Sequence, residues 1–333
     1  MLIQSSIILV ILSFSIIYIV SKLSYKFNLL DKPNKRKIHK ISTPYTGGIA
    51  LTFIFFFIIY YFEFDHILLN NILIYGSFIA LGGFIDDKYN LSAGSKILFQ
   101  LFPIIMLMNE GLYLSEINLG KVGIIELGSF SKVFTCICCL YIINSLNYSD
   151  GIDGFASVIT LSCLINLFLI VDKFNYNFEY FLFYISIVLL IFLAFNLNLL
   201  KLPKIFLGDC GSLLLGYIIA FIVIFTNVIL NVNAFALIWV FPLLVYEFLS
   251  TNLARLINKR DTFKPGRDHI HYYLLKILKK KNLVNIFGLS FNLAVGIVGY
   301  NIYLVSNELF SLIIFIILFL LYFFVRENFI LKI

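Results

Sequence analysis

Eleven apolar runs fill most of this chain of 333 residues and leave only short polar segments between them. An α-helix needs about 20 apolar residues to cross a bilayer, so a chain of this kind folds as a bundle of membrane-spanning helices. The runs are continuous rather than alternating, which excludes an outer-membrane β-barrel. A content of 61% hydrophobic and only 13% charged residues excludes a water-soluble fold. We predict an all-α transmembrane bundle of about 10–11 spans that forms a single domain over residues 1–333. The runs lie near residues 2–20, 46–62, 70–85, 95–108, 131–146, 155–171, 178–195, 212–230, 233–256, 284–304 and 309–325.

Basic residues gather on one side of this predicted bundle. Of the 25 Lys and Arg residues, 22 fall in alternate loops and in the tail, and only Lys121, Lys132 and Lys173 fall on the other side. The positive-inside rule makes the basic side cytoplasmic, which places the N-terminus outside and the C-terminus inside. Orientation thus explains most of the net charge of +7, so we expect no nucleic-acid partner. The first run lacks a basic leader and an Ala-x-Ala site, so we expect a retained span rather than a cleaved signal peptide.

Polar residues concentrate in the cytoplasmic segments of this topology. Gly47-Gly48 lets backbone approach a ligand or a neighbouring helix, although the basic stretch before it would also suit a loop lying on anionic lipid. Asp86 and Asp87 are followed by Lys96. Adjacent carboxylates at the end of a span are costly to desolvate, so we expect them to face a polar cavity or a cation, unless they form a simple turn among headgroups. The five segments lie near residues 21–48, 86–96, 144–154, 196–212 and 257–283.

The third and fourth segments place carboxylates beside flexible backbone. Asn144 and Asn147 share one helical face and are followed by two Asp-Gly turns, at Asp150-Gly151 and Asp153-Gly154. This density of Asn, Asp and Gly favours a binding site over a plain linker. In the fourth segment Asp209 stands between glycines at a predicted helix N-terminus, where it could ligate a metal beside phosphate or simply cap the helix.

The fifth segment carries Arg267, His269 and His271. A zinc site would need a third ligand that the spacing does not supply, so these side chains are better suited to phosphate oxygens. Glu247 lies inside the preceding apolar run, with Arg255 two turns along the same face, and an ionisable group there is a functional candidate. Carboxylates, amides and cations on one membrane face are the groups that phosphoryl transfer uses, and a site at this depth suits a lipid phosphate.

Five motifs in order resemble those of the polyprenyl-phosphate N-acetylhexosamine-1-phosphate transferases, the family that includes the phospho-N-acetylmuramoyl-pentapeptide transferases. They are DKPNKRKIH with PYTGG, GGFIDD, NSLNYSDGIDG, FLGDCGS and RDHIH, and they cover residues 31–275. The resemblance implies a multi-pass enzyme of the bacterial inner membrane that uses Mg²⁺, or Mn²⁺ in its place, at a cytoplasmic active site. It would transfer a sugar 1-phosphate from a UDP-sugar to undecaprenyl phosphate and release UMP. Both parts of the first motif, DKPNKRKIH and PYTGG, look closer to the N-acetylglucosamine branch than to the muramoyl-pentapeptide branch. The implied role is the first membrane step of a cell-envelope glycan pathway.

The same resemblance implies roles for individual residues. Asp209 would be the main metal ligand, assisted by Asn147. Asp86 and Asp87 would lie beside the acceptor phosphate, as a base or as orienting groups. The other expected substrate-binding residues are Lys96 at a phosphate, Phe206 on uracil, Gly151 and Asp153 at the uridine edge, Arg267, His269 and His271 at the pyrophosphate, and in addition Asn144 and Asp150.

Two positions depart from the pattern of the family. Tyr272 stands where a further histidine is common, and Glu247 stands where an aspartate is usual, followed by Arg255 alone rather than by a pair of arginines. These changes put the identity of the sugar in question more than the reaction. Three alternatives stay open: a different UDP-sugar, a flippase of lipid-linked sugars, which should carry polar groups at mid-membrane, and an inactive scaffold. The sequence also leaves open whether the protein forms a homodimer.

Overall fold

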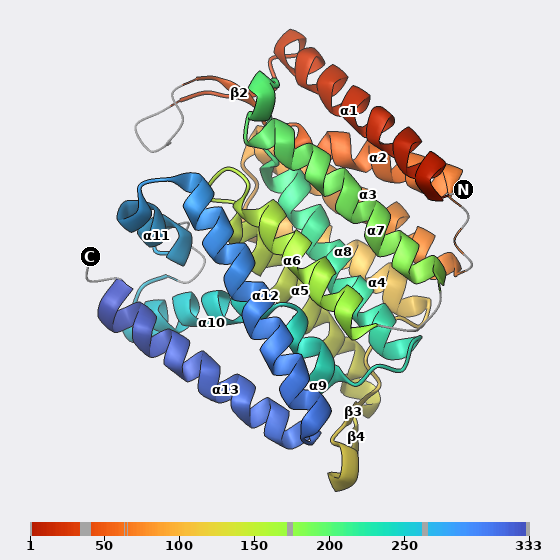
Figure 1. The fold of residues 1–333 in the computed structure, drawn as a ribbon, viewed down its shortest axis with the longest axis vertical. Helices are drawn as coiled ribbons and strands as arrows, with labels where there is room; N and C mark the ends of the chain where they lie inside the picture. The colour runs from red at the N-terminus through yellow and green to blue at the C-terminus, as the bar shows by residue number, and fades with distance from the viewer. Residues whose placement is uncertain are drawn as a thin grey trace. The chain divides into compact units, whose positions relative to one another are not determined.

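The structure, a computed structural model, describes residues 2–33, 41–62, 64, 66–171, 176–261 and 266–330. Most of these residues are helical, which confirms the predicted all-α membrane fold (Figure 1). The basic stretch 34–40, with its His39, lies outside the described residues. The described helices are α1 (Leu2–Lys26), α2 (Gly47–Tyr61), α3 (Ile67–Tyr89), α4 (Ala93–Asn109), α5 (Ser131–Ser149), α6 (Phe155–Ile170), α7 (Tyr176–Asn196), α8 (Gly208–Val228), α9 (Ala234–Leu237), α10 (Pro242–Ile257), α11 (Ile270–Leu278), α12 (Lys281–Val305) and α13 (Glu308–Val325).

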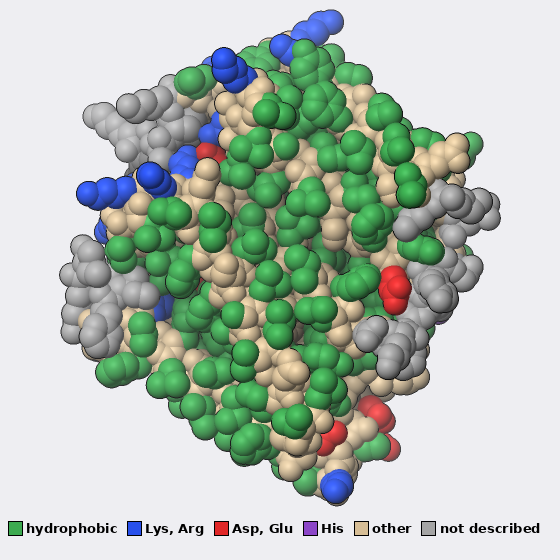
Figure 2. Space-filling view, viewed as in Figure 1, with side chains coloured by type: hydrophobic (Ala, Val, Ile, Leu, Met, Phe, Trp, Pro, Cys, Tyr) green, Lys and Arg blue, Asp and Glu red, His purple; other side chains and the backbone are tan. Residues whose placement is uncertain are grey.

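The helices account for the eleven apolar runs in three ways. Seven of them, α1, α3, α5, α7, α8, α12 and α13, are long and apolar enough to cross a membrane. Three apolar helices are shorter: α2, α4 and α6 have 15, 17 and 16 residues. The run at 233–256 is broken, because α9 and the turn Ile238–Val240 meet α10 at a bend of 80°. Hydrophobic side chains predominate on the surface in Figure 2, as contact with lipid requires. The protein is therefore a multi-pass membrane protein, while its direction of insertion stays a prediction.

The break before α10 follows from a proline. Pro242 has no N–H and opens a new helix, so the preceding carbonyl groups need other donors. Asn166 and Asn292 supply them, each donating its Nδ2 to the carbonyl of Val240 at 3.2 Å. The Oδ1 of Asn292 in turn accepts from the N–H of Leu243 at 3.0 Å. Since an interrupted helix is tolerated in a membrane only when such groups are satisfied, the two asparagines make this bend possible.

The chain forms two compact units, each built from two separate stretches. The first unit combines Met1–Glu110 with Asn175–Ile218, and the second combines Gly111–Phe174 with Ile219–Ile333. In the first unit, α1 packs against α7 and α2, and α3 packs against α2 and α4. In the second unit, α12 lies along α6, and α10 packs against α5. The apolar pattern of the sequence carries no sign of this division.

Two short antiparallel ladders accompany the helices. In the first unit β1 (Leu30–Asp31) pairs with β2 (Thr43–Pro44), just before α2. In the second unit β3 (Glu116–Asn118) pairs with β4 (Ile124–Glu126). The second ladder lies in the segment between α4 and α5.

Candidate functional site

Four predicted site residues come together in the first unit. Asp86 and Asp87 lie in the last turn of α3, Lys96 in the first turn of α4, and Asp209 in the first turn of α8. We call these four residues the acidic cluster. Two of these carboxylates, Asp86 and Asp209, pair with the single ammonium group of Lys96, so the cluster carries a surplus of negative charge.

Lys96 is the ion-pair partner of two of these carboxylates. Its Nζ pairs with Asp86 and lies 3.4 Å from Oδ2 of Asp209. The two partners differ in exposure, since the side chain of Asp86 is 3% exposed and that of Asp209 is 35% exposed. Asp86 also accepts the backbone N–H of Leu91 at 2.8 Å, which closes the end of α3. Asp209 is thus the carboxylate of this pair that a ligand can reach.

Asp87 serves the backbone of a different helix. Its Oδ1 accepts the N–H of Asp209 at 3.0 Å, and its Oδ2 accepts the N–H of Cys210 at 3.1 Å. The N-terminal N–H groups of a helix need such acceptors, so Asp87 caps α8 from α3. Gly208 adopts φ +72°, and a Cβ atom there would lie 2.7 Å from the Asp87 carboxylate. The sequence offered Asp209 itself as a helix cap, whereas the structure gives that task to Asp87.

The glycine motifs of the first unit pack backbone against backbone. Phe206 donates its N–H to the carbonyl of Pro44 at 2.7 Å and accepts from the N–H of Gly47 at 2.9 Å. A Cβ atom on Gly48 would overlap the backbone of Gly211, at the start of α8. The motifs PYTGG and FLGDCGS therefore interlock, which fixes where Asp209 lies. Lys204 stands over the ring of Phe206 at 5.1 Å, and the predicted contact of this ring with uracil stays a prediction.

In the second unit, the predicted Asn and Asp residues lie in the C-terminal part of α5 and in the turn that follows it. Asn144 donates its Nδ2 to the carbonyl of Leu140 at 2.7 Å, one turn earlier in the same helix. Asp153 pairs with Lys281 of α12 at 2.6 Å, a partner that the sequence reading did not find. Asn147 and Asp150 belong to the last turn of α5 and its C-cap, where the N–H of Asp150 donates to the carbonyl of Asn147 at 3.1 Å.

Gly151 lies directly against a buried histidine. A Cβ atom on Gly151 would overlap Nε2 of His271 and approach the hydroxyl of Tyr272 to 2.7 Å, so only glycine fits there. The side chain of His271 is 1% exposed, and its Nε2 has no hydrogen-bond partner within the described part of the chain. Burial, together with the nearby His269, lowers the pKa of His271 to about 3. His271 is therefore neutral at physiological pH.

The turn that leads into α11 is anchored by ionic contacts. Arg255 holds the carboxylate of Asp268 by two bonds, from Nε at 2.8 Å and from Nη2 at 2.7 Å. The bond from Arg255 lowers the pKa of Asp268 below its usual value. Arg267 is exposed and stands over the ring of Tyr272 at 6.0 Å, so a hydrophilic ligand can reach its guanidinium.

Glu247 pairs with Arg326, a residue that entered the sequence analysis only as one of the basic residues of the cytoplasmic tail. Its carboxylate accepts from Nε of Arg326 at 3.1 Å, from the hydroxyl of Tyr322 at 2.6 Å and from the hydroxyl of Thr251 at 2.9 Å. Arg326 is 1% exposed although it follows the apolar helix α13. A single arginine directly after a long apolar run could have marked Arg326 as a candidate, but nothing in the sequence pointed to Glu247 as its partner. We call Glu247, Thr251, Arg255, Asp268, Tyr322 and Arg326 the arginine network.

Metal binding was predicted for Asp209 and Asn147, which belong to different units. Among the described residues, no group of three or more His, Cys, Asp and Glu side chains is arranged to hold a metal ion. Mg²⁺ does not need such a group, because it commonly binds one or two carboxylates together with phosphate oxygens and water. The partly exposed carboxylate of Asp209 meets this requirement in its chemistry.

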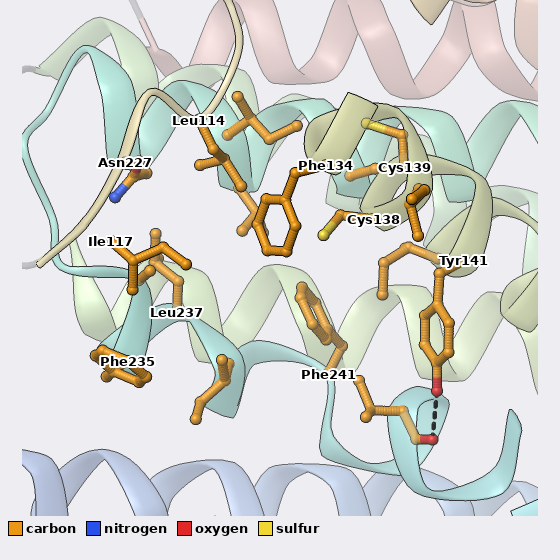
Figure 3. Close-up of a pocket in the computed structure, with 18 of the residues that line it drawn as sticks. Leu114, Ile117, Phe134, Cys138, Cys139, Tyr141, Asn227, Phe235, Leu237 and Phe241 are labelled. Atoms are coloured by element: carbon orange, nitrogen blue, oxygen red, sulfur yellow. Dashed lines mark hydrogen bonds between the residues drawn. The ribbon is translucent and has the colours of Figure 1, made fainter. Parts of the chain in front are cut away.

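A large apolar cavity lies in the second unit, beside α5 (Figure 3). Its volume is about 640 Å³, and Phe134, Cys138 and Phe241 are among the residues that line it. Tyr141 closes one end and donates its hydroxyl to the carbonyl of Val245 at 2.7 Å. The cavity lies along α5, and the predicted Asn and Asp residues lie about two turns further along the same helix, at its C-terminal end. An apolar ligand would fit it.

Comparison with known proteins gives consistent results. Residues 69–227 match the sequence profile described as glycosyl transferase family 4. A relative in Bacillus subtilis (strain 168), a probable undecaprenyl-phosphate N-acetylglucosaminyl 1-phosphate transferase, is 30% identical over 84% of this chain and 76% of its own length. Two undecaprenyl-phosphate alpha-N-acetylglucosaminyl 1-phosphate transferases are each 27% identical. That of Yersinia pestis matches over 93% of this chain and 87% of its own length, and that of Escherichia coli (strain K12) over 78% and 72%.

Proposed function

Because the chain belongs to glycosyl transferase family 4, we propose that it transfers N-acetylglucosamine 1-phosphate from UDP-N-acetylglucosamine to undecaprenyl phosphate. An oxygen of the lipid phosphate would attack the phosphorus next to the sugar, and the bond from that phosphorus to the bridging oxygen would break. The products are UMP and a sugar joined to the lipid through a pyrophosphate. The observation that carries this proposal is the acidic cluster, which places a surplus of carboxylates and one lysine at helix ends of a membrane protein.

The acceptor needs little help to react. A phosphate monoester loses its second proton near pH 6, so undecaprenyl phosphate is largely a dianion at neutral pH. Asp86 and Asp87 already accept backbone N–H groups, Asp86 from Leu91 and Asp87 from the start of α8. These contacts support an orienting role for the two carboxylates rather than that of a base. Lys96 supplies the positive charge that binds a phosphate among them.

We propose Mg²⁺, with Mn²⁺ as a substitute, as the cofactor held by Asp209 and assisted by Asn147. When bound, the cation would neutralise charge on the phosphate oxygens of the donor. Asp87 fixes the backbone at Asp209 through the two N–H groups that it caps. Because Gly208 and Gly48 leave no room for side chains, this backbone has little freedom to move. The chain thus presents the Asp209 carboxylate in a constant position.

On the donor side we assign the pyrophosphate to Arg267, His269 and His271. Arg267 is exposed and always charged, so it is the member of this group that supplies positive charge, whereas His271 is buried and neutral. The uridine would lie near Phe206 and near residues at the end of α5 and in the turn after it, namely Asn144, Asp150, Gly151 and Asp153. The apolar cavity beside α5 supports a lipid substrate, since it can take isoprene units without desolvating polar groups.

The site would face the cytoplasm of a bacterial inner membrane, where the basic loops and the nucleotide-sugar donor both lie. This orientation is testable by labelling cysteines introduced in the loops on either side. The flippase alternative is less well supported, because the buried polar groups at the bend before α10 are the amides of Asn166 and Asn292, which are occupied by backbone.

The function is tested with purified protein, labelled undecaprenyl phosphate and a panel of UDP-sugars. We expect UMP release and a lipid-linked product with UDP-N-acetylglucosamine, and neither after chelation of divalent cations. Activity with a different UDP-sugar alone would correct the donor and keep the reaction. If every donor fails while the protein remains folded, the transferase proposal is wrong and the scaffold alternative gains support.

A further inference from the structure

We propose that Arg326 is a positioning residue for the donor-binding histidines, because it holds the turn 268–270 in place together with Glu247. The proposal rests on the proposed function, in which Arg267, His269 and His271 bind the donor pyrophosphate. Arg326 lies more than 50 residues away from that turn in the sequence, at the end of α13.

All three guanidinium nitrogens of Arg326 make contacts within the protein. Its Nε donates to Glu247 at 3.1 Å, and its Nη1 pairs with Glu327. Its Nη2 donates to the hydroxyl of Thr251 at 2.9 Å and to the backbone carbonyl of Asp268. A guanidinium presents five N–H donors in one rigid plane, which a lysine ammonium cannot do. The contacts therefore depend on arginine itself.

Arg326 and Glu247 fasten the turn from both sides of His269. The carbonyl before this histidine, that of Asp268, accepts from Arg326. The N–H after it, that of Ile270, donates to Oε1 of Glu247 at 2.9 Å. His269 is thereby held between two anchored peptide groups, with its Nδ1 3.6 Å from Glu247.

The same anchoring reaches His271 through the first turn of α11. The rings of His269 and His271 lie nearly parallel, at 8°, with centroids 5.7 Å apart. Arg255 holds the side chain of Asp268 from α10, while Arg326 holds its backbone from the end of α13. Two arginines, one in α10 and one at the end of α13, thus hold Asp268, the residue directly before His269.

Stability alone is a poor reason for such a pair. Burying an arginine and a glutamate carries a large desolvation penalty, and well-packed apolar residues would usually stabilise a helix contact at least as well. Apolar side chains could not, however, donate to the Asp268 carbonyl or accept from the Ile270 N–H. The ion pair of Arg326 and Glu247 therefore serves to fix the geometry of the turn 268–270.

The test uses three variants, Arg326→Gln, Arg326→Lys and the double variant Glu247→Gln with Arg326→Gln. The double variant leaves no uncompensated buried charge, so it keeps the test valid if the single glutamine variant does not fold. We expect Arg326→Gln and the double variant to raise the KM for UDP-N-acetylglucosamine at least about tenfold and to lower kcat/KM about 100-fold, the scale of a 1 Å displacement at a reacting group. The KM for undecaprenyl phosphate should not change, and Arg326→Lys should recover part of the loss. Lys121→Gln, which removes an exposed charge from the segment between β3 and β4, should behave as the wild type.

Hydrogen exchange of the backbone amides at 268–272 gives a readout that does not depend on activity. Faster exchange there in Arg326→Gln, with the rest of the chain unchanged, supports the proposal. An unchanged exchange rate, a donor KM equal to that of the wild type, or loss of folding in all three variants would overturn it. If the wild-type protein transfers no sugar phosphate from any donor, the proposed function fails separately, and the exchange rates still decide whether Arg326 holds the turn.

Discussion

The acidic cluster and the arginine network both gather charge at helix ends, but they balance it differently. In the cluster two carboxylates, those of Asp86 and Asp209, share Lys96, and the side chains of Lys96 and Asp209 are 37% and 35% exposed. In the network Glu247 and Asp268 each have an arginine partner, and Arg326 is 1% exposed. An exposed surplus of negative charge attracts a cation, whereas a balanced and buried set of charges fixes geometry. The difference supports chemistry at the cluster and positioning at the network.

The largest effect is expected at the cluster itself. Asp209→Asn keeps the size of the side chain and removes the exposed charge, so UMP release should fall by about 10³-fold, the scale of losing one essential electrostatic group. The rate of UMP release with saturating substrates measures it. Glu126→Gln, an exposed carboxylate in β4, is the matched control and should leave the rate unchanged. Near wild-type activity in Asp209→Asn would remove the cluster from the mechanism.

A smaller loss of activity is expected for Lys96→Gln. This change removes the ammonium group between Asp86 and Asp209, so kcat/KM should fall by about 10²-fold through weaker binding of phosphate. Lys96→Arg keeps the charge and should restore part of the rate. Steady-state kinetics with each substrate varied in turn measure kcat/KM for both variants. An equal loss of kcat/KM in Lys96→Gln and Lys96→Arg would contradict a role for the charge.

The backbone contact that places Asp209 can be broken without touching a charge. In Gly48→Ala the new methyl group meets the backbone of Gly211, which cannot rotate away, so the free energy of unfolding should fall by about 1–3 kcal/mol. Thermal unfolding in detergent measures this change. Gly94→Ala is the matched control, because its Cβ position has open space around it, with only the backbone of α4 itself nearby, and alanine suits that helix. Equal melting temperatures for both variants would contradict the close packing.

The smallest expected effect is the pH dependence of stability that follows from the burial of His271. His271 has a pKa of about 3 when folded and about 6.5 when unfolded, so the unfolded chain binds one more proton between these values. The folded state should therefore lose about 2 kcal/mol as the pH falls from about 7.5 to about 5. His271→Gln removes this titration and should flatten the pH dependence of the melting temperature. If the melting temperature of His271→Gln depended on pH as steeply as that of the wild type, His271 would not titrate differently in the folded and unfolded chains, which would contradict its burial.

Sequence reasoning found the helices more readily than their contacts. Long apolar runs predict spans because a helix must be long enough to cross the bilayer core. The run at 233–256 was predicted as one span, and the break before Pro242 appeared only in the structure. Asp86, Asp87, Lys96 and Asp209 were recognisable because charge is rare in such a chain. The close approach at Gly47-Gly48 was also expected, but the sequence did not show that its partner is the start of α8.

The contacts of the arginine network were beyond the reach of local patterns. Helical spacing placed Glu247 and Arg255 on one face, but the structure gives each of them a different partner. Glu247 and Arg326 are separated by 79 residues, and no periodicity links positions so far apart. The burial of His271 was also hidden, because a histidine in a basic segment looks exposed until the position of Gly151 is known.

Mn²⁺ binding to the purified protein, followed by electron paramagnetic resonance, tests whether the acidic cluster holds the cation. We expect that the wild type binds Mn²⁺ in the presence of UDP-N-acetylglucosamine, that Asp209→Asn loses this binding, and that the double variant Glu247→Gln with Arg326→Gln still binds the ion when donor is saturating. Unchanged Mn²⁺ binding in Asp209→Asn would contradict the claim that the acidic cluster holds the cation.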